Sequence, residues 1–302
     1  MTEQKPIHIL VIYHKNCTDG FGAAWAMYDF FENVQGKVYD SISYMSADYG
    51  DEPPDNIENM CVYIVDFSYS RNAVLAMAEK AESVTVIDHH KTAKEELENL
   101  EHKNLTVVFD MEKSGAVLAW EYLHDGYLEP PYLLRLIEDR DLWKFEYQNT
   151  KPALAALRSR PFDFKLWTTF MRNERAVKDV LVSEGYVIQR AQTVLIQELI
   201  DNHTRMLTLI LPPNPSPYVS ATVPILNCPG QFASEAGHLL CGIYKNSPFS
   251  TTYYDDVKAG KRIFSLRSTE GGFDVSEIAK LYGGGGHKHA AGFKQKLPTH
   301  FV

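Results

Sequence analysis

Short apolar runs alternate with amphipathic stretches over the first half of the chain. Apolar, β-branched runs predict buried strands, and apolar residues spaced three or four positions apart predict helices. The runs predict strands at Ile7–Tyr13, 38–45, Cys61–Val65, Thr85–Ile87 and Leu105–Phe109. Helices are predicted at Phe21–Phe31, Arg71–Ala81, Ser114–His124 and Tyr132–Glu138. Strands that alternate with helices are typical of a parallel α/β sheet.

The composition changes in the second half of the chain. Residues 153–203 look mostly helical, and the proline-rich run Leu211–Pro217 then marks a turn or linker. A helix near Ser234–Leu240 and strands near 249–254 and 262–268 follow. The sequence therefore predicts an α/β protein: a parallel-sheet catalytic domain with a helical extension at 1–190 and a smaller α/β domain at 205–302.

Composition and charge limit the partners. Hydrophobic residues make up 45% of the 302 residues, which is ordinary for a globular protein. The net charge of −9 argues against a long duplex, whose binding surface is basic, but not against a short nucleotide. We expect no membrane span and no signal peptide. The four cysteines form no Cys-x-x-Cys pair, which fits a reducing cytoplasm.

Chemistry follows the fourth predicted strand, at Asp88-His89-His90. Ligands of parallel sheets bind beyond the carboxyl ends of the strands. A carboxylate beside two imidazoles can bind a divalent cation or a phosphate. For this triplet alone, a polar strand end with satisfied hydrogen bonds is an equally good interpretation.

Other acids and a histidine stand at similar places. His14 and Asp19 flank the turn into the first helix, Asp66 follows the third strand, and Asp139 and Asp141 follow a helix. Asp19 could instead cap its own helix, and Asp66 could cap a turn. Carboxylates and imidazoles suit Mg²⁺ and Mn²⁺. A bridging carboxylate can hold two such ions about 3.5–4 Å apart.

A glycine run, Gly283–Gly286, precedes His287 near the end of the chain. Consecutive glycines can direct backbone N–H groups at an anion, and the histidine can donate to a phosphate. Arg267, on a predicted strand, suits bidentate phosphate contact. The alternative is a flexible linker, which the following Ala290–Phe293 disfavours.

Together these motifs resemble the DHH phosphoesterase superfamily, in the branch with the DHH-associated C-terminal domain. The resemblance covers about 7–143 and 205–297. Asp88-His89-His90 alone is a weak match, but Gly-Gly-Gly-Gly-His-x-x-Ala-Ala-Gly-Phe almost two hundred residues later makes the pair specific. Small bacterial and phage members of this type include nano-RNases, which trim very short oligonucleotides.

The resemblance implies roles in the first domain. His14 and Asp19 would be ligands of one metal ion, Asp66 the bridging carboxylate and His89 a ligand of the second ion. Asp139 best matches the last metal-binding aspartate of the family, with Asp141 close enough to compete.

It also implies roles at the substrate. His90 would contact the scissile phosphate, and Asp88 would orient the motif. In the second domain, the resemblance implies a substrate-gripping surface made of Arg267, Ser268, Gly285, Gly286 and His287.

One position departs from the family pattern. Many members carry Asp-x-Asp in the first motif, and here Cys17 stands two residues before Asp19. The cysteine could ligate a softer metal or merely pack. The coordination of the first ion therefore stays open.

The sequence as a whole predicts a phosphodiesterase with two divalent ions, Mn²⁺ first and Mg²⁺ as the alternative. It would hydrolyse short single-stranded RNA or DNA, or small nucleotides, to nucleoside monophosphates in a cleft between the domains. We expect a cytoplasmic protein and leave a homodimer open. The alternatives are a phosphatase for 3′-phosphoadenosine 5′-phosphate, a cyclic dinucleotide or polyphosphate, and a weakly active nucleotide-binding protein.

Overall fold

The structure is a computed structural model that describes residues 6–33, 39–211 and 219–297. The chain divides into two compact units, Met1–Gln189 and Arg190–Val302. The division falls inside one long helix, α9 (Ser183–His203). Positions 212–217 of the predicted linker lie outside the described residues.

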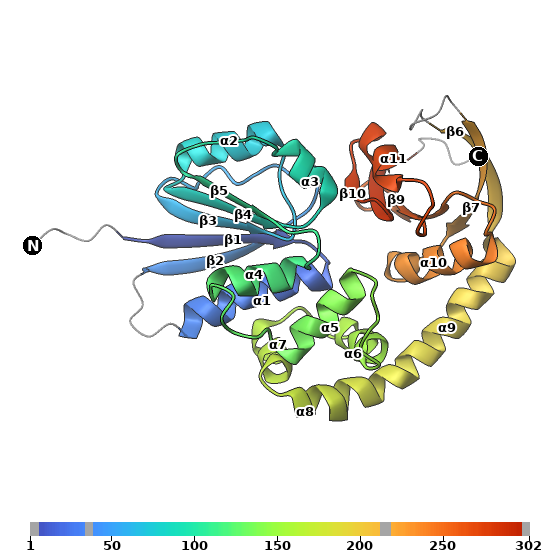
Figure 1. The fold of residues 1–302 in the computed structure, drawn as a ribbon, viewed down its shortest axis with the longest axis horizontal. Coiled ribbons are helices and arrows are strands. Elements are labelled where there is room, and N and C mark those ends of the chain that lie inside the picture. Colours follow the sequence, from blue (N-terminus) through green and yellow to red (C-terminus); the bar gives the residue numbers. More distant parts are fainter. Residues whose placement is uncertain (1–5, 34–38, 212–218, 298–302) are drawn as a thin grey trace, which may run out of the picture. The chain divides into compact units, whose positions relative to one another are not determined.

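A five-stranded parallel sheet forms the centre of the first unit (Figure 1). The strand order is β2-β1-β3-β4-β5. Since all five strands run the same way, their carboxyl ends share one edge of the sheet. The parallel α/β sheet predicted from the sequence is confirmed. The strands are β1 (His8–His14), β2 (Ser41–Ala47), β3 (Met60–Val65), β4 (Ser83–Asp88) and β5 (Leu105–Phe109).

Helices cover both faces of this sheet. In Figure 1, α2 and α3 lie over one face, and α1 and α4 lie over the other. Alternate residues of β1 divide between these layers, as the two-residue period of a strand requires. Ile9 and Val11 pack into the cluster with α1 and α4, and Ile12 packs into the cluster with α2. The four helices are α1 (Thr18–Asn33), α2 (Arg71–Lys80), α3 (Lys91–Glu96) and α4 (Gly115–Leu123).

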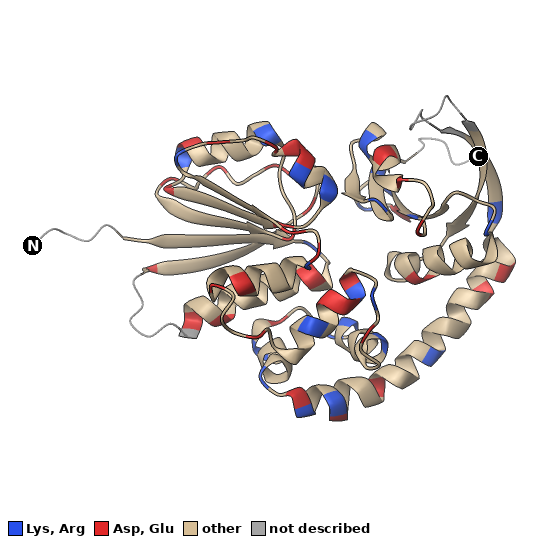
Figure 2. Cartoon of the chain, in the orientation of Figure 1, with Lys and Arg blue, Asp and Glu red and all other residues tan. Residues whose placement is uncertain are grey.

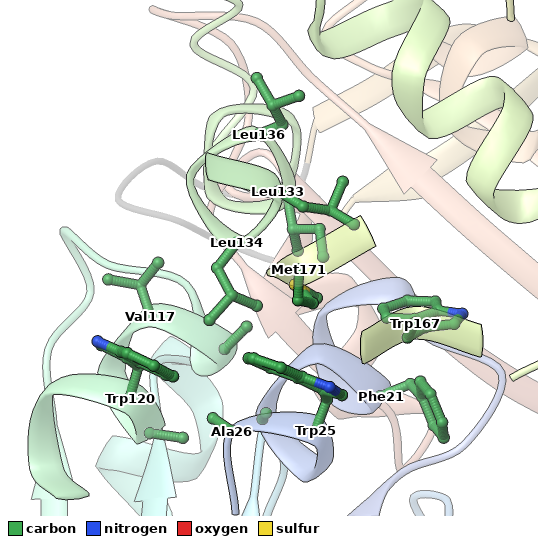
Figure 3. Close-up of a cluster of buried hydrophobic side chains, with 14 of the residues drawn as sticks. Phe21, Trp25, Ala26, Val117, Trp120, Leu133, Leu134, Leu136, Trp167 and Met171 are labelled. Atoms are coloured by element: carbon green, nitrogen blue, oxygen red, sulfur yellow. The ribbon is translucent and has the colours of Figure 1, made fainter. Parts of the chain in front are cut away.

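The larger hydrophobic cluster joins α1 and α4 to a helical extension (Figure 3). The rings of Trp25 and Trp120 stack 6.0 Å apart, and Trp167 of the extension is fully buried beside Phe21. This packing fixes the start of α1 against the extension. The extension consists of α5 (Tyr132–Asp141), α6 (Thr150–Arg158), α7 (Phe164–Met171), α8 (Glu174–Ala176) and a π-helical turn (Val177–Val182) that leads into α9.

A mixed six-stranded sheet forms the second unit, in the order β10-β11-β9-β8-β7-β6. The pair β7–β8 is parallel, and the other neighbours are antiparallel. Helix α11 packs in one hydrophobic cluster of this unit, and α10 packs in another with the end of α9. The elements are β6 (Arg205–Leu211), β7 (Val219–Asn227), a 3₁₀ turn (Gly230–Phe232), α10 (Ala233–Ile243), β8 (Ser250–Asp256), β9 (Lys261–Arg267), α11 (Val275–Leu281), β10 (Gly285–His287) and β11 (Ala290–Lys296).

The glycine run does not form an open loop. Gly285–His287 is strand β10, which pairs with the start of β11. Gly286 has a φ of 136°, and a Cβ there would lie 2.5 Å from the carbonyl oxygen of Ala290. Glycine is therefore needed for the pairing itself, and phosphate binding by this segment stays a prediction.

None of the helices in the described ranges is both long enough and apolar enough to cross a membrane.

Candidate metal centre

Ionisable side chains gather where the strands of the first unit end. His14 is the last residue of β1, Asp66 directly follows β3, and Asp88 is the last residue of β4. Figure 2 shows acidic residues on the loops at these strand ends. In each of three sets made of first-unit residues, the ligand atoms lie within 4.8 Å of one another: Asp66-Asp88-His89-His90, His14-Cys17-Asp66 and Asp19-His89-Asp141.

Asp66 belongs to two of these sets and is 1% exposed. Its Oδ1 lies 3.1 Å from Nε2 of His89, and its Oδ2 lies 3.4 Å from Nδ1 of His14. Burial would raise the pKa of this carboxyl, but the two histidines outweigh it and hold the pKa well below its usual range. The backbone at Asp66 has a φ of 62°, a left-handed conformation that is uncommon for residues other than glycine. A carboxylate with one oxygen toward each imidazole has the arrangement that a bridging ligand requires.

His89 is 1% exposed and faces three carboxylates. Its Nε2 lies 3.5 Å from Oδ2 of Asp19 and 3.6 Å from Oδ2 of Asp141, in addition to its contact with Asp66. Burial lowers the pKa of the imidazole, but the three acids outweigh burial and raise the pKa to about 10. Without a metal ion, the positive charge among these acids therefore sits on the imidazole.

Asp88 holds the motif that follows it. Its Oδ1 accepts hydrogen bonds from the backbone N–H of His89 (2.7 Å) and of His90 (3.2 Å). The same oxygen lies 2.7 Å from Nδ1 of His90. A carboxylate at Nδ1 fixes the orientation of an imidazole ring, so Asp88 sets both the backbone turn and the His90 ring.

Asp19 does not cap its own helix. It lies in the first turn of α1, and its carboxylate accepts from the backbone N–H of Gly115 (2.6 Å) and of Ala116 (3.1 Å) at the start of α4. Burial and the charges of Asp66 and Asp141 raise the pKa of this carboxyl. A Cβ at Gly115 would lie 2.6 Å from Oδ1 of Asp66. The close approach of α4 to the centre therefore depends on Gly115, which sequence reasoning missed.

The geometry distinguishes Asp139 from Asp141. The carboxylate of Asp139 accepts from the backbone N–H of Glu146 (2.7 Å) and of Tyr147 (3.2 Å), and from the hydroxyl of Thr150. These hydrogen bonds direct the Asp139 carboxylate toward the loop after α5. Asp139 belongs to none of the ligand sets found among the described residues. Asp141 lies beside His89 instead, so the geometry favours Asp141 as the candidate ligand over Asp139, which the sequence favoured.

His14 has neighbours that sequence reasoning missed. Its Nε2 lies 3.8 Å from Oδ1 of Asp48, and its ring stacks on Phe67 and meets the ring of Tyr49 edge-on. Burial lowers the pKa of His14, but Asp48 and Asp66 outweigh burial and raise the pKa well above its usual value. Asp48 directly follows β2, which ends at Ala47, beyond the predicted strand end. An acid at the end of a parallel strand was the signal that could have found it.

The expected substrate-binding residues of the second unit lie on neighbouring strands. Arg267 is the last residue of β9. Its guanidinium donates to Oγ of Ser234 (2.8 Å) and to the carbonyl oxygen of Leu266. Oγ of Ser268 lies 2.9 Å from Nδ1 of His289, a residue that was not predicted. Strand β11 pairs with β9 on one side and with β10, which carries Gly285, Gly286 and His287, on the other. Contact of these groups with substrate stays a prediction.

The comparisons with known proteins identify the domain in which this centre lies. Residues 8–139 match the DHH family, N-terminal domain. This match places the domain that carries the centre in the DHH family.

Two proteins and one solved structure are similar to most of this chain. The chain is 31% identical over 291 residues to the uncharacterized protein R106 of Acanthamoeba polyphaga mimivirus. The matched stretch covers 94% of this chain and 66% of that protein, so the chain spans just under two thirds of the length of this relative. It is 26% identical over 304 residues to oligoribonuclease NrnB of Bacillus subtilis, covering 93% and 71%. RecJ of Thermus thermophilus in complex with Mn²⁺ has the same fold, with a TM-score of 0.50 and 15% identity over 96% of this chain and 49% of RecJ.

Proposed function

We propose that the protein is a phosphodiesterase that uses two divalent metal ions to hydrolyse short oligonucleotides or dinucleotides to nucleoside monophosphates. The observation that carries this proposal is the buried carboxylate of Asp66 between His14 and His89. The identity with an oligoribonuclease supports the substrate class. Mn²⁺ is the first choice of metal and Mg²⁺ the second, because both accept carboxylate and imidazole ligands.

The residues at the strand ends fit such ions. Oδ2 of Asp66 and Nδ1 of His14 are buried and make no hydrogen bond among the described residues. Buried polar atoms are almost always partnered, so a ligand of positive charge would satisfy both. His14 and Asp66 would hold one ion, and Asp66, Asp19, His89 and Asp141 would hold the other. This grouping moves Asp19 away from His14, because the start of α4 directs its carboxylate toward His89.

The chain supplies the remaining parts of the reaction. Divalent ions bound here would make a water more acidic and stabilise charge on the phosphoryl oxygens. His90, whose ring Asp88 holds in place, would donate a hydrogen bond to the scissile phosphate. In the second unit, Arg267 and Ser268 would bind the part of the nucleotide that does not react, since a guanidinium suits a phosphate.

A substrate panel tests the proposal. The full-length protein is incubated with Mn²⁺ and end-labelled RNA and DNA from dinucleotides to decanucleotides. In parallel reactions, 3′-phosphoadenosine 5′-phosphate, a cyclic dinucleotide and polyphosphate are tested as alternative substrates. We expect nucleoside monophosphates from the shortest oligonucleotides, and no products in EDTA. Turnover of polyphosphate or 3′-phosphoadenosine 5′-phosphate with no cleavage of any oligonucleotide would contradict the proposal.

A further inference from the structure

Cys17 stands at the turn between β1 and α1. Its carbonyl oxygen accepts the backbone N–H of Phe21 (3.0 Å) at the start of the helix, and the preceding Asn16 has a φ of 56°. The turn thereby places the side chain of Cys17 with a ring nitrogen of His14 and a carboxylate oxygen of Asp66, all three within 4.8 Å of one another.

The surroundings of Cys17 differ from those of a packing cysteine. Cys61 and Cys228 both belong to hydrophobic clusters of the described residues, whereas Cys17 belongs to none of them. Its neighbours are instead a ring nitrogen of His14 and a carboxylate oxygen of Asp66. Nδ1 of His14 and Oδ2 of Asp66 lie 3.4 Å apart, and both are buried without a hydrogen bond among the described residues. The sulfur of Cys17, a ring nitrogen of His14 and a carboxylate oxygen of Asp66 therefore form one set of three metal-donor atoms.

The two sets of donor atoms in this centre differ in chemistry. Asp19, His89 and Asp141 offer two carboxylates and one imidazole. His14, Cys17 and Asp66 offer one carboxylate, one imidazole and one sulfur. Hard ions such as Mg²⁺ select oxygen ligands, whereas a thiolate favours borderline ions such as Co²⁺ and Zn²⁺. The sulfur therefore changes which ion the first set prefers.

We propose that Sγ of Cys17 is a ligand of the ion held by His14 and Asp66, and that it makes this position select a borderline ion such as Co²⁺ or Zn²⁺ over Mg²⁺. The inference rests on the proposed metal centre and deepens it, because the two metal positions then have different preferences. When the sulfur–metal bond forms, the thiol proton passes to solvent. Asp19, His89 and Asp141 keep the preference of an oxygen-rich position.

Cobalt spectroscopy tests the sulfur bond directly. The metal-free full-length protein is titrated with Co²⁺, and the near-ultraviolet band of a thiolate-to-cobalt charge transfer is recorded. We expect the band in the wild type, its loss in Cys17→Ser and Cys17→Asp, and its retention in the matched control Cys61→Ser. A Co²⁺-loaded wild type without the band, or a Cys17→Ser variant that keeps it, would overturn the inference.

Calorimetry of metal binding gives a second readout. Cys17→Asp replaces the sulfur by a hard oxygen, so the ratio of Co²⁺ to Mg²⁺ affinity should fall by about tenfold or more, a change comparable to the loss of other supporting groups at metal sites. An unchanged ratio would overturn the role of Cys17 but leave the proposed function intact. A wild type that binds no divalent ion at all would instead overturn the proposed function.

A measurement without variants covers the case in which the substitutions at Cys17 prevent folding. The wild type is alkylated with and without Co²⁺, and each cysteine is followed by mass spectrometry. Bound Co²⁺ should protect Cys17 and leave the labelling of Cys241 unchanged. Equal labelling of Cys17 in both samples would overturn the inference.

Discussion

The two units of the protein bury different kinds of polar groups. Among the described residues, the buried carboxylates and imidazoles all lie in the first unit, at Asp19, Asp66, Asp88, His89 and Asp139. The buried polar side chains of the second unit are hydroxyls, at Ser250, Thr251, Thr252, Ser268 and Ser276. A buried charge is costly without a partner, whereas a hydroxyl needs only a hydrogen bond.

The topology of the two sheets explains this difference. In the first unit, five parallel strands bring their carboxyl ends to one edge, so that acids distant in sequence meet there. In the second unit, most neighbouring strands are antiparallel, and strand ends alternate between the two edges. The first arrangement therefore suits the binding of ions.

The largest effect is expected at the residue shared by two ligand sets. Asp66→Ala should lower turnover of a dinucleotide by about a thousandfold or more, because metal ions contribute several kcal/mol to the reaction and each 1.36 kcal/mol is tenfold in rate. Asp55→Ala, at a side chain that is 96% exposed, is the matched control and should leave the rate unchanged. Near wild-type turnover by Asp66→Ala would show that Asp66 is only a turn residue.

A pair of variants separates a metal ligand from a structural acid. Asp141→Asn should reduce turnover strongly and leave the free energy of unfolding nearly unchanged, since Asp141 is partly exposed. Asp139→Asn should lower the free energy of unfolding by about 1.5–3 kcal/mol, because its charged carboxylate accepts three hydrogen bonds. Kinetics and urea unfolding of both variants give the comparison, and the reverse pattern would return the ligand role to Asp139.

A second pair compares the two units. His90→Ala should reduce turnover about a hundredfold on both a dinucleotide and a small chromogenic diester, as expected for a group that acts on the reacting phosphate. Arg267→Ala should raise KM for the dinucleotide about tenfold and leave the small diester unaffected, because that substrate lacks the distant part. Equal losses on both substrates for Arg267→Ala would remove the proposed binding role of the second unit.

Proton release tests the metal-free state of the centre and needs no variant. The pKa of His89 is raised to about 10, so its imidazole carries a proton at neutral pH in the metal-free protein. An ion that takes His89 as a ligand must displace this proton, and the raised pKa of Asp19 acts in the same direction. The apparent Mg²⁺ affinity should therefore increase between about pH 6 and about pH 8, by up to tenfold per unit for each proton released. Calorimetry in two buffers of different ionisation enthalpy measures this release, and a flat affinity would contradict the assignment of His89.

The strand-end motifs were predictable because they depend on local patterns and one topological rule. Apolar runs located the strands, and parallel strands must end at one edge. The choice between Asp139 and Asp141 was not predictable. The groups that donate hydrogen bonds to Asp139 belong to Glu146, Tyr147 and Thr150, which come later in the chain. The partner of Asp19 lies 96 residues away at the start of α4, so local reasoning offered an N-cap instead.

Two other features depended on contacts that no local pattern reveals. The end of β2 was placed too early, so Asp48 was not recognised as a strand-end acid beside His14. The glycine run was taken for a loop, but Gly285 and Gly286 pair with Gly292 and Ala291 of β11. In both cases the residue type indicated a special role. The sequence did not show which distant residues would lie beside it in the fold.

The number of bound ions tests the central claim most directly. The metal-free protein is equilibrated with Mn²⁺, and the bound metal is counted by elemental analysis for the wild type, for Asp66→Asn and for Asp55→Asn as control. Two ions per chain in the wild type and the control, with at most one weakly held ion in Asp66→Asn, is the predicted result. Two tightly bound ions in Asp66→Asn would show that Asp66 does not bridge them, and a wild type with no bound ion would contradict the metal centre itself.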